Sequence, residues 1–216
     1  MAPRPDGPRN HPRPLLPHLR HLFLARHGET DWNLAGRWQG HTDVPLNATG
    51  RAQAGALAER LRGEGIATVG TSDLSRARHT AEIVAAALGV PVALVDPGLR
   101  EQRFGRFEGL TPRECEERHP REWARYVADP HAGPPGGESR ATVLERVVRA
   151  VEGAAARLSE PALLVTHGGA IRALLAALPA TTGAPGSGAP GRIPNGGVVR
   201  VSLAAGRTVA ATWLDL

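Results

Sequence analysis

Two histidines of this chain directly follow short apolar runs, and each is accompanied by residues that suit an anion. Residues 22–25 lead into Arg26, His27 and Gly28, and residues 162–166 lead into His167 and two glycines. A neutral imidazole nitrogen can attack phosphorus, and a guanidinium offers a planar fork that matches phosphoryl oxygens. Open α/β sheets bind ligands at the carboxyl ends of their strands. Together the segments predict a phosphate-handling site, although one Arg-His pair alone would better fit a histidine satisfied in the core.

Arg76 is a third candidate for the same site. A short apolar run at residues 67–70 leads through Ser72 and Asp73 into a helical pattern over residues 75–88. A cation in the first turn of a helix interacts unfavourably with the helix dipole, so its presence there indicates an anion nearby. Taken by itself, Arg76 would also fit a solvated surface arginine.

A metal or an organic cofactor is not expected. His41, His79, His119 and His131 show neither H-x-x-H nor H-E-x-x-H spacing, and Cys115 is the single cysteine. The arginine beside His27 would repel a cation. The chain has no lysine, which excludes Schiff-base chemistry and the Walker lysine, and no strand leads into a G-x-G-x-x-G loop.

Strand and helix patterns alternate along the chain, which predicts an α/β fold: a three-layer sandwich with a mostly parallel central sheet flanked by helices. The expected strands are residues 22–26, 66–71, 92–95, 162–166, 197–203 and 208–213. The expected helices are residues 48–63, 75–88, 111–127, 138–158 and 169–178, with Cys115 as an unreactive small residue in the third. Residues 179–192 are rich in glycine and proline and read as a flexible surface connector rather than a lid.

The first 21 residues predict a disordered tail ahead of one domain over residues 22–216. Residues 1–20 hold six prolines and no hydrophobic periodicity, so they cannot bury enough surface to order themselves. They also hold four arginines and one aspartate, which leaves 22 basic and 20 acidic residues in the rest of the chain. Because the domain is nearly neutral and aromatic residues are only 4% of the chain, we expect no nucleic-acid partner.

No apolar run reaches the roughly 18 residues of a membrane-spanning helix, and the N-terminus lacks the apolar core of a signal peptide. One cysteine cannot form an internal disulfide, which fits a reducing compartment. We therefore expect a soluble, cytoplasmic protein that does not bind a membrane.

Over residues 22–203 the chain resembles the histidine phosphatase superfamily, in its phosphoglycerate-mutase-like branch. The segments that carry the resemblance, in the order of the family, are Arg26-His27-Gly28-Glu29-Thr30 with Trp32-Asn33, Gly36-Arg37-Trp38-Gln39-Gly40, Asp43-Val44-Pro45-Leu46-Asn47 running into Gly50-Arg51-Ala52-Gln53-Ala54, Ser72-Asp73-Leu74-Ser75-Arg76-Ala77, Leu99-Arg100-Glu101 with Phe104-Gly105, Glu108-Gly109, Gly136-Gly137-Glu138-Ser139, Val165-Thr166-His167-Gly168-Gly169 and Ile193-Pro194-Asn195-Gly196. The family has a three-layer fold with one antiparallel strand, and the resemblance implies that architecture here.

The resemblance also implies roles for the matching residues. His27 corresponds to the nucleophile that takes the phosphoryl group, and Glu101 to the general acid that protonates the leaving group and then activates water. The other positions implied to hold the phosphoryl oxygens are Arg26, Arg76, His167, Asn33, Gln39 and the backbone N–H of Gly169. Arg37, Arg100 and Arg103 are expected at the rim. An isolated Glu101 would read as a surface carboxylate, but it follows the expected strand 92–95 closely enough to reach the same sheet edge.

The activity expected from this pattern is a metal-independent phosphomonoesterase that hydrolyses a small phosphorylated metabolite through a phosphohistidine. A cofactor-dependent phosphoglycerate mutase is the alternative, but such mutases carry a longer insertion after the catalytic glutamate and a mobile basic tail. Here only residues 102–135 separate Glu101 from Gly136, and residues 204–216 look strand-like. A catalytically silent anion-binding domain is the third possibility, weakened by the presence of both histidines, both arginines and Glu101.

Overall fold

The computed structural model describes residues 19–129, 131–178, 181–182 and 193–214. Its centre is a seven-stranded sheet in the order β3-β2-β4-β1-β6-β7-β5. The strands are β1 (Arg20–Arg26), β2 (Thr68–Thr71), β3 (Val92–Val95), β4 (Ala162–Thr166), β5 (Thr181–Thr182), β6 (Val198–Ala204) and β7 (Arg207–Leu214). Every pairing is parallel except those of β6 with β1 and β7, so β6 alone runs antiparallel. The mostly parallel sheet and the one antiparallel strand are confirmed.

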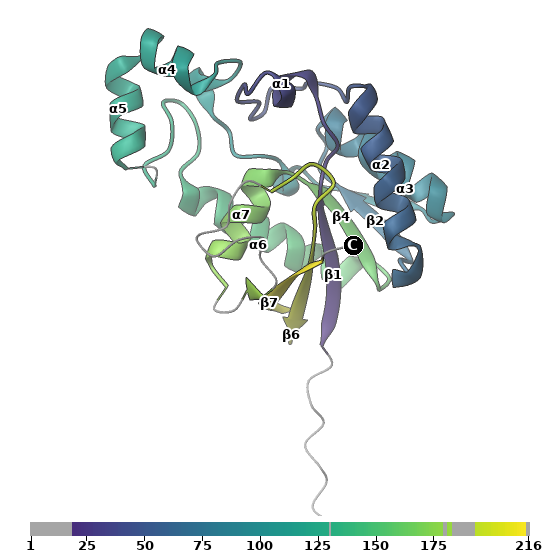
Figure 1. Cartoon of the computed structure of the whole chain (residues 1–216). Coiled ribbons are helices and arrows are strands. Elements are labelled where there is room, and N and C mark those ends of the chain that lie inside the picture. The colour runs from purple at the N-terminus through teal and green to yellow at the C-terminus, as the bar shows by residue number, and fades with distance from the viewer. Residues whose placement is uncertain (1–18, 130, 179–180, 183–192, 215–216) are drawn as a thin grey trace, which may run out of the picture.

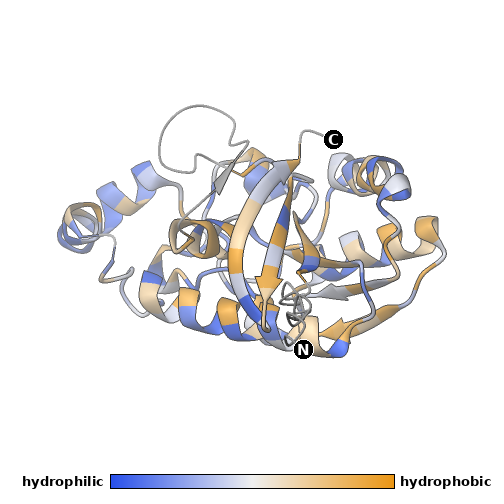
Figure 2. Ribbon diagram, turned by 90° about the horizontal axis from the view of Figure 1, so that it is seen from below, coloured by the Kyte–Doolittle hydropathy of each residue, from blue (hydrophilic) through white to orange (hydrophobic). Residues whose placement is uncertain are grey.

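Helices cover both faces of this sheet, which explains why residues 22–25 of β1 and 162–165 of β4 are continuous apolar runs. The helices α2 (Ala48–Leu61) and α3 (Ser75–Leu88) lie on one face, and α6 (Arg140–Arg157) and α7 (Gly168–Ala176) on the other (Figure 1). Along β1, Leu22 and Leu24 pack with α6 and α7, whereas Phe23 and Ala25 pack with α2 and α3. This alternation is that of a strand buried on both sides, and Figure 2 shows hydrophobic residues along the strands between the two helical layers.

The expected helix over residues 111–127 is wrong in one respect, because it is two helices. They are α4 (Pro112–Arg118) and α5 (Pro120–Ala128), and they stand apart from the sheet in Figure 1. Proline disfavours the helical conformation of the residue before it, and His119 accordingly takes φ −135° and ψ 53°. Beneath these helices lies an aromatic cluster that includes Phe107, Trp123 and Tyr126. Cys115 is buried there, and burial raises the pKa of its thiol to about 11, which keeps it protonated and unreactive.

Most expected elements are found with bounds that differ by one or two residues, and three segments differ further. The strand β1 begins at Arg20, before the expected end of the tail at residue 21, and residues 1–18 lie outside the described residues. Within the expected connector 179–192, Thr181 and Thr182 pair with β7, while the remainder lies outside the described residues. The short helix α1 (Asp31–Leu34), capped by Thr30, was not expected. Within the described residues, no helix is long and apolar enough to cross a bilayer.

Candidate active site

The register of the parallel strands brings the two histidines together. Arg26 at the end of β1 pairs with Thr166 at the end of β4, and the His27 amide extends the ladder to the Thr166 carbonyl at 3.0 Å. Each histidine therefore leaves its strand at the same level of the sheet. Their ring centroids are 5.1 Å apart with planes inclined at 60°. The predicted meeting of His27 and His167 at one sheet edge is found.

Arg76 reaches the same edge of the sheet from β2, which pairs with β4 on the side opposite to β1. The strand β2 ends at Thr71, where the Ser72 amide still donates to the Val165 carbonyl at 3.0 Å. The chain then turns into α3, whose second residue is Arg76. The Asp43 carboxylate accepts a hydrogen bond of 2.8 Å from the first amide of this helix, that of Ser75. The guanidinium of Arg76 is thus carried to the strand ends by a rigid strand-helix unit.

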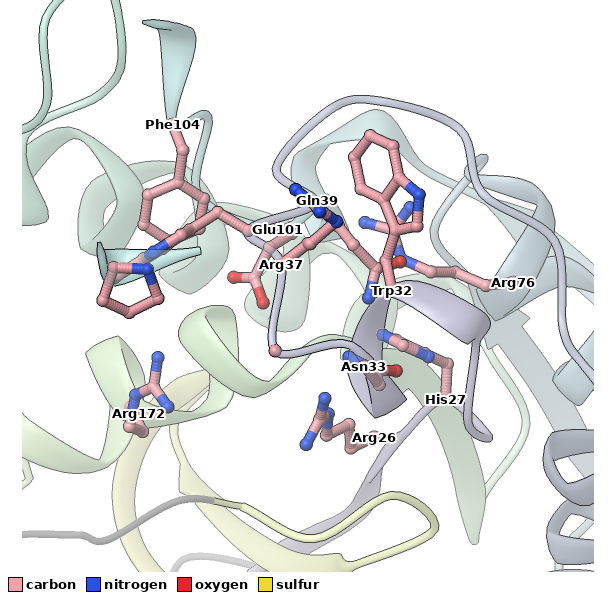
Figure 3. Close-up of a pocket in the computed structure, with 13 residues that line it drawn as sticks. Arg26, His27, Trp32, Asn33, Arg37, Gln39, Arg76, Glu101, Phe104 and Arg172 are labelled. Atoms are coloured by element: carbon pink, nitrogen blue, oxygen red, sulfur yellow. The ribbon is translucent and has the colours of Figure 1, made fainter. Parts of the chain in front are cut away.

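These side chains open into a pocket of about 340 Å³. In Figure 3, Arg26, His27, Asn33 and Arg76 gather toward one side of this pocket, Arg172 and Phe104 lie toward the other, and Glu101 lies between them. The residues that line it are Arg26, His27, Trp32, Asn33, Gly36, Arg37, Trp38, Gln39, Arg76, Glu101, Phe104, Pro112 and Arg172. Six of the predicted site residues line the pocket, whereas His167 and Gly169 lie behind its wall.

His27 is held as a neutral imidazole with one nitrogen available. Its Nδ1 lies 2.6 Å from the Gly28 carbonyl oxygen, which can only accept, so Nδ1 carries the proton. The unprotonated Nε2 is left for the pocket. Burial lowers the pKa of His27 well below its usual 6.5, and the charges of Arg76 and Arg26 lower it further. The ring is therefore uncharged at neutral pH, the state in which an imidazole nitrogen can act as a nucleophile.

Arg76 and His167 are buried with part of their hydrogen-bonding capacity unused. The Arg76 guanidinium is fully buried and donates to the carbonyls of Thr42 at 2.9 Å and Gly40 at 2.8 Å. Burial lowers the pKa of Arg76 to about 10, opposed chiefly by the charge of Glu101, so it stays cationic at neutral pH. Arg76 Nε and both ring nitrogens of His167 have no hydrogen-bond partner among the described residues. Buried polar groups are costly unless paired, so this corner of the site suits an anion with several oxygens.

His167, like His27, is kept neutral. Burial lowers the pKa of His167 well below 6.5, and Arg76 is the largest charge that adds to this effect. A phosphate oxygen brought beside Arg76 would offer His167 the acceptor that it lacks. Two neutral histidines between two arginines therefore form a cradle that gains from an incoming negative charge.

Arg26 and Asn33 are tied to the loop that precedes β6. Arg26 Nη1 donates to the Ile193 carbonyl at 2.5 Å, and Asn195 Nδ2 donates both to the His27 carbonyl at 2.9 Å and to Asn33 Oδ1 at 3.2 Å. Asn33 Oδ1 also accepts from the Thr30 amide in the capping box of α1. With its oxygen so engaged, Asn33 presents its amide N–H group to the pocket. Asn195 thus positions both the His27 backbone and the Asn33 amide, a role that its sequence context alone did not indicate.

Glu101 is held by two backbone amides. Its Oε1 accepts from the Gln102 amide at 2.8 Å, and its Oε2 accepts from the Gly169 amide at 3.0 Å. The Gly169 amide at the start of α7 therefore has a different partner from the predicted one: it binds the Glu101 carboxylate and not a pocket ligand. A Cβ at position 169 would overlap Glu101 Oε1, so glycine is required for this approach. The carboxylate takes the anion site of the helix N-terminus.

The mouth of the pocket, formed by Trp32, Arg37, Pro112 and Arg172, differs most from expectation. Of the three arginines expected at the rim, only Arg37 lines the pocket, and its Nη1 is 2.5 Å from the Glu114 carboxylate. Arg100 instead pairs with Asp73 at 2.5 Å, and Arg103 does not line the pocket. Arg172 was missed. It is the only charged residue in the apolar helix α7, one turn from Gly168, and that isolated cation was the available signal.

Four arginines line this pocket against one carboxylate, that of Glu101. The described residues contain no cluster of three metal-ligating side chains. The charge balance of the lining therefore suits a ligand that carries negative charge. Gln39, also predicted, is buried at the pocket wall with its Oε1 unpaired among the described residues.

Comparison with known proteins agrees with this site. The family model of the histidine phosphatase superfamily (branch 1) matches residues 22–216. A metal-independent phosphoserine phosphatase of Arabidopsis thaliana is 34% identical over 199 residues, which cover 90% of this chain and 81% of that protein. A probable phosphoglycerate mutase of Yersinia enterocolitica is 40% identical over 168 residues, covering 73% of this chain and 74% of that protein.

Among solved structures, a mycobacterial glucosyl-3-phosphoglycerate phosphatase in complex with VO3 superposes with a TM-score of 0.74 at 32% identity, covering 91% of this chain and 98% of that one. The family model matches most of the chain, the relatives are 34% and 40% identical, and the fold is shared, so one conclusion follows. This chain belongs to the histidine phosphatase superfamily.

Proposed function

We propose that this protein is a metal-independent phosphomonoesterase that hydrolyses small phosphorylated metabolites through a phosphohistidine at His27. The observation that carries the proposal is the unprotonated Nε2 of His27 in the same pocket as the guanidinium groups of Arg26 and Arg76. A neutral nucleophile beside two cations suits attack on a phosphate dianion, and both arginines would repel a metal ion at this histidine.

In the first step, His27 Nε2 attacks phosphorus in line with the ester oxygen. The new N–P bond forms as the P–O bond to the leaving group breaks, and the leaving oxygen takes a proton from the Glu101 carboxyl group. Arg26, Arg76 and His167 offset the charge on the transferring phosphoryl group. The products of this step are an alcohol and phosphorylated His27.

In the second step, water attacks the same phosphorus. Glu101, now a carboxylate, takes a proton from that water as the P–N bond breaks, which releases inorganic phosphate and restores neutral His27. One carboxyl group thus acts twice, first as acid and then as base. Glu101 lines the pocket between His27 and the mouth, where a leaving group or a water would lie.

The relatives bear the names of both phosphatases and mutases, so the choice depends on this chain. Residues 207–214 form β7, which is hydrogen-bonded to β6 on one side and to β5 on the other. In a mutase these residues would belong to a mobile tail. The described residues between Glu101 and Gly136, which are 102–129 and 131–135, form loops, the 3-10 turn Gly105–Phe107, α4 and α5, without a long insertion. Both features favour hydrolysis over retention of the phosphoryl group.

The mouth favours an ester whose alcohol part carries a second negative charge. Arg37 and Arg172 lie there, and Arg172 has no ion pair or hydrogen bond among the described residues. The names of two relatives specify phosphoserine and glucosyl-3-phosphoglycerate, and each of those compounds carries a carboxylate near its phosphate. We therefore place carboxylated phosphate esters first among the substrates.

A panel of phosphorylated metabolites, scored for inorganic phosphate release beside an isomerisation assay with 3-phosphoglycerate, tests the proposal. We expect phosphate release that EDTA does not reduce and that vanadate, a mimic of five-coordinate phosphorus, inhibits. Conversion of 3-phosphoglycerate to 2-phosphoglycerate faster than phosphate release would establish the mutase instead. Activity lost to EDTA and restored by zinc or magnesium would overturn metal independence.

A further inference from the structure

The ion pair between Arg146 and Glu138, which lies outside the pocket lining, is hydrogen-bonded to the segment that carries Glu101. Arg146, on α6, forms a bidentate pair with Glu138 through Nε to Oε1 at 2.8 Å and Nη2 to Oε2 at 2.7 Å. The same guanidinium donates to three backbone carbonyls: Nη1 to Arg100 at 2.7 Å and Gly98 at 3.1 Å, and Nη2 to Glu101 at 2.7 Å. Neither Arg146 nor Glu138 lines the pocket.

Glu138 binds the same segment just beyond Glu101. Its Oε2 accepts from the Arg103 amide at 2.9 Å, and its own amide donates to the Arg103 carbonyl at 2.9 Å. The Glu138 carbonyl accepts from Gln102 Nε2 at 2.8 Å. Residues 98–103 are thus bound on both sides of Glu101 by one pair of side chains and the backbone of Glu138.

The segment needs such support because it has little structure of its own. After the 3-10 turn Pro97–Leu99, residues 100–104 belong to no helix or strand. A catalytic carboxyl group must be held to within about 0.5 Å of its working position, and loops do this less well than regular elements. Both Arg146 and Glu138 are largely buried, with side-chain exposures of 15% and 17%, so solvent does little to loosen the pair.

We propose that the Arg146–Glu138 pair positions Glu101 for proton transfer. Its bonds converge on the backbone of the one loop that carries the proton donor, and the Glu101 carbonyl also lies 2.9 Å from His41 Nε2. The groups that hold the phosphoryl oxygens are anchored elsewhere, Arg76 by the Gly40 and Thr42 carbonyls and Arg26 by Ile193. Loss of the pair therefore affects proton donation and leaves phosphate binding in place. This inference rests on the proposed role of Glu101.

The test compares leaving groups. Arg146→Lys, which keeps the charge but loses the planar fork, and Glu138→Gln, which loses the charged pair, are assayed beside Glu101→Gln on p-nitrophenyl phosphate and on an alkyl phosphate. General acid catalysis is worth about 10²- to 10⁴-fold for a poor leaving group, so misplacing the acid should lower kcat/KM for the alkyl ester about 10- to 100-fold. The same variants should change kcat/KM for p-nitrophenyl phosphate and the vanadate inhibition constant by less than about threefold, because transfer of the phosphoryl group to His27 from an ester with a good leaving group needs no proton donor, and kcat/KM does not include the later hydrolysis of phosphorylated His27.

Arg149→Lys is the matched control, since Arg149 lies on the same helix but pairs with Glu145 at an exposed site. It should leave both substrates unaffected. In a Glu101→Gln background, Arg146→Lys should add almost no further loss, because residues that act as one unit are not additive.

Equal losses on both substrates, or full additivity with Glu101→Gln, would show that the pair only stabilises the fold and would overturn the inference. If Glu101→Gln itself shows no dependence on the leaving group, the proposed role of Glu101 fails, and the inference with it. If that dependence is present but the variants of the pair lack it, only the inference fails. A variant that folds poorly would be recognised by its lowered melting temperature. In that case the leaving-group comparison is made with the variant of the other residue of the pair.

Discussion

The inner end of the pocket and its mouth are built from different kinds of structure. At the inner end, Arg26, His27, Arg76 and His167 are at most 8% exposed and lie at strand ends or in the first turn of a helix. At the mouth, Trp32, Arg37, Pro112 and Arg172 come from short helices, a loop and the flank of α7, and all are partly or fully exposed. The inner groups are placed by sheet register, which cannot slip without reversing every buried side chain of a strand. The mouth is placed by peripheral packing, which can vary while the chemistry stays.

Replacing the nucleophile should give the largest effect and should be confined to activity. His27→Asn removes the nitrogen that we propose attacks phosphorus, so we expect turnover to fall at least about 10³-fold on every ester. Brief reaction with labelled substrate and an alkaline quench should show acid-labile label on the wild type and none on the variant.

The control is His79→Asn, since His79 is exposed on α3 and does not line the pocket. It should keep full activity. Labelled His27→Asn protein, or turnover near that of the wild type, would remove His27 from the mechanism and make the inner end a binding site only.

Between pH 7.5 and 5, acid should lower the free energy of unfolding through the two buried histidines at the inner end of the pocket. The pKa values of His27 and His167 are lowered by burial, so the unfolded chain binds protons in a range where the folded chain does not. Stability therefore falls as pH drops below the ordinary histidine pKa of about 6.5, by about 1.4 kcal/mol per pH unit for each buried histidine until its lowered pKa is reached.

Urea unfolding at several pH values between 7.5 and 5 measures this slope. His167→Gln should reduce the loss of stability in this range, whereas Arg172→Gln at the mouth should leave the slope unchanged. A slope that is the same in the wild type and in His167→Gln would mean that His167 is not kept neutral in the folded protein.

The smallest expected effect is at the mouth, and it should depend on the substrate. Arg172→Gln removes a cation that faces the leaving group, so KM for a carboxylated ester should rise about tenfold, the low end for one charge-assisted hydrogen bond. Neither kcat nor the KM for p-nitrophenyl phosphate should change more than about twofold, since that ester has no second anion. Arg200→Gln, at an exposed position on β6 outside the pocket, is the control. Equal changes for both esters would contradict a role for Arg172 in choosing the substrate.

Much of the inner end could be predicted because its signals are local. An apolar run that stops at Arg26-His27, a second that stops at His167 and an arginine in the first turn of a helix each lie within a few residues of chain. Parallel strands end at one edge of a sheet, so these pieces meet once the fold class is right. The break at His119 was also readable, because a proline follows it, but the helical pattern on both sides of the break masked it.

By itself, then, the sequence determined the α/β class, the elements that end at the site and the position of His27, the proposed nucleophile, because hydrophobic periodicity and strand ends depend on neighbours along the chain. Only the tertiary structure decided the rest: the Gly169 amide binds Glu101, and Arg146 binds the loop of Glu101. Those contacts join residues 45 to 68 positions apart, and their partners are backbone atoms, which every residue possesses. No residue type or spacing marks such a partner in advance, so packing selected it.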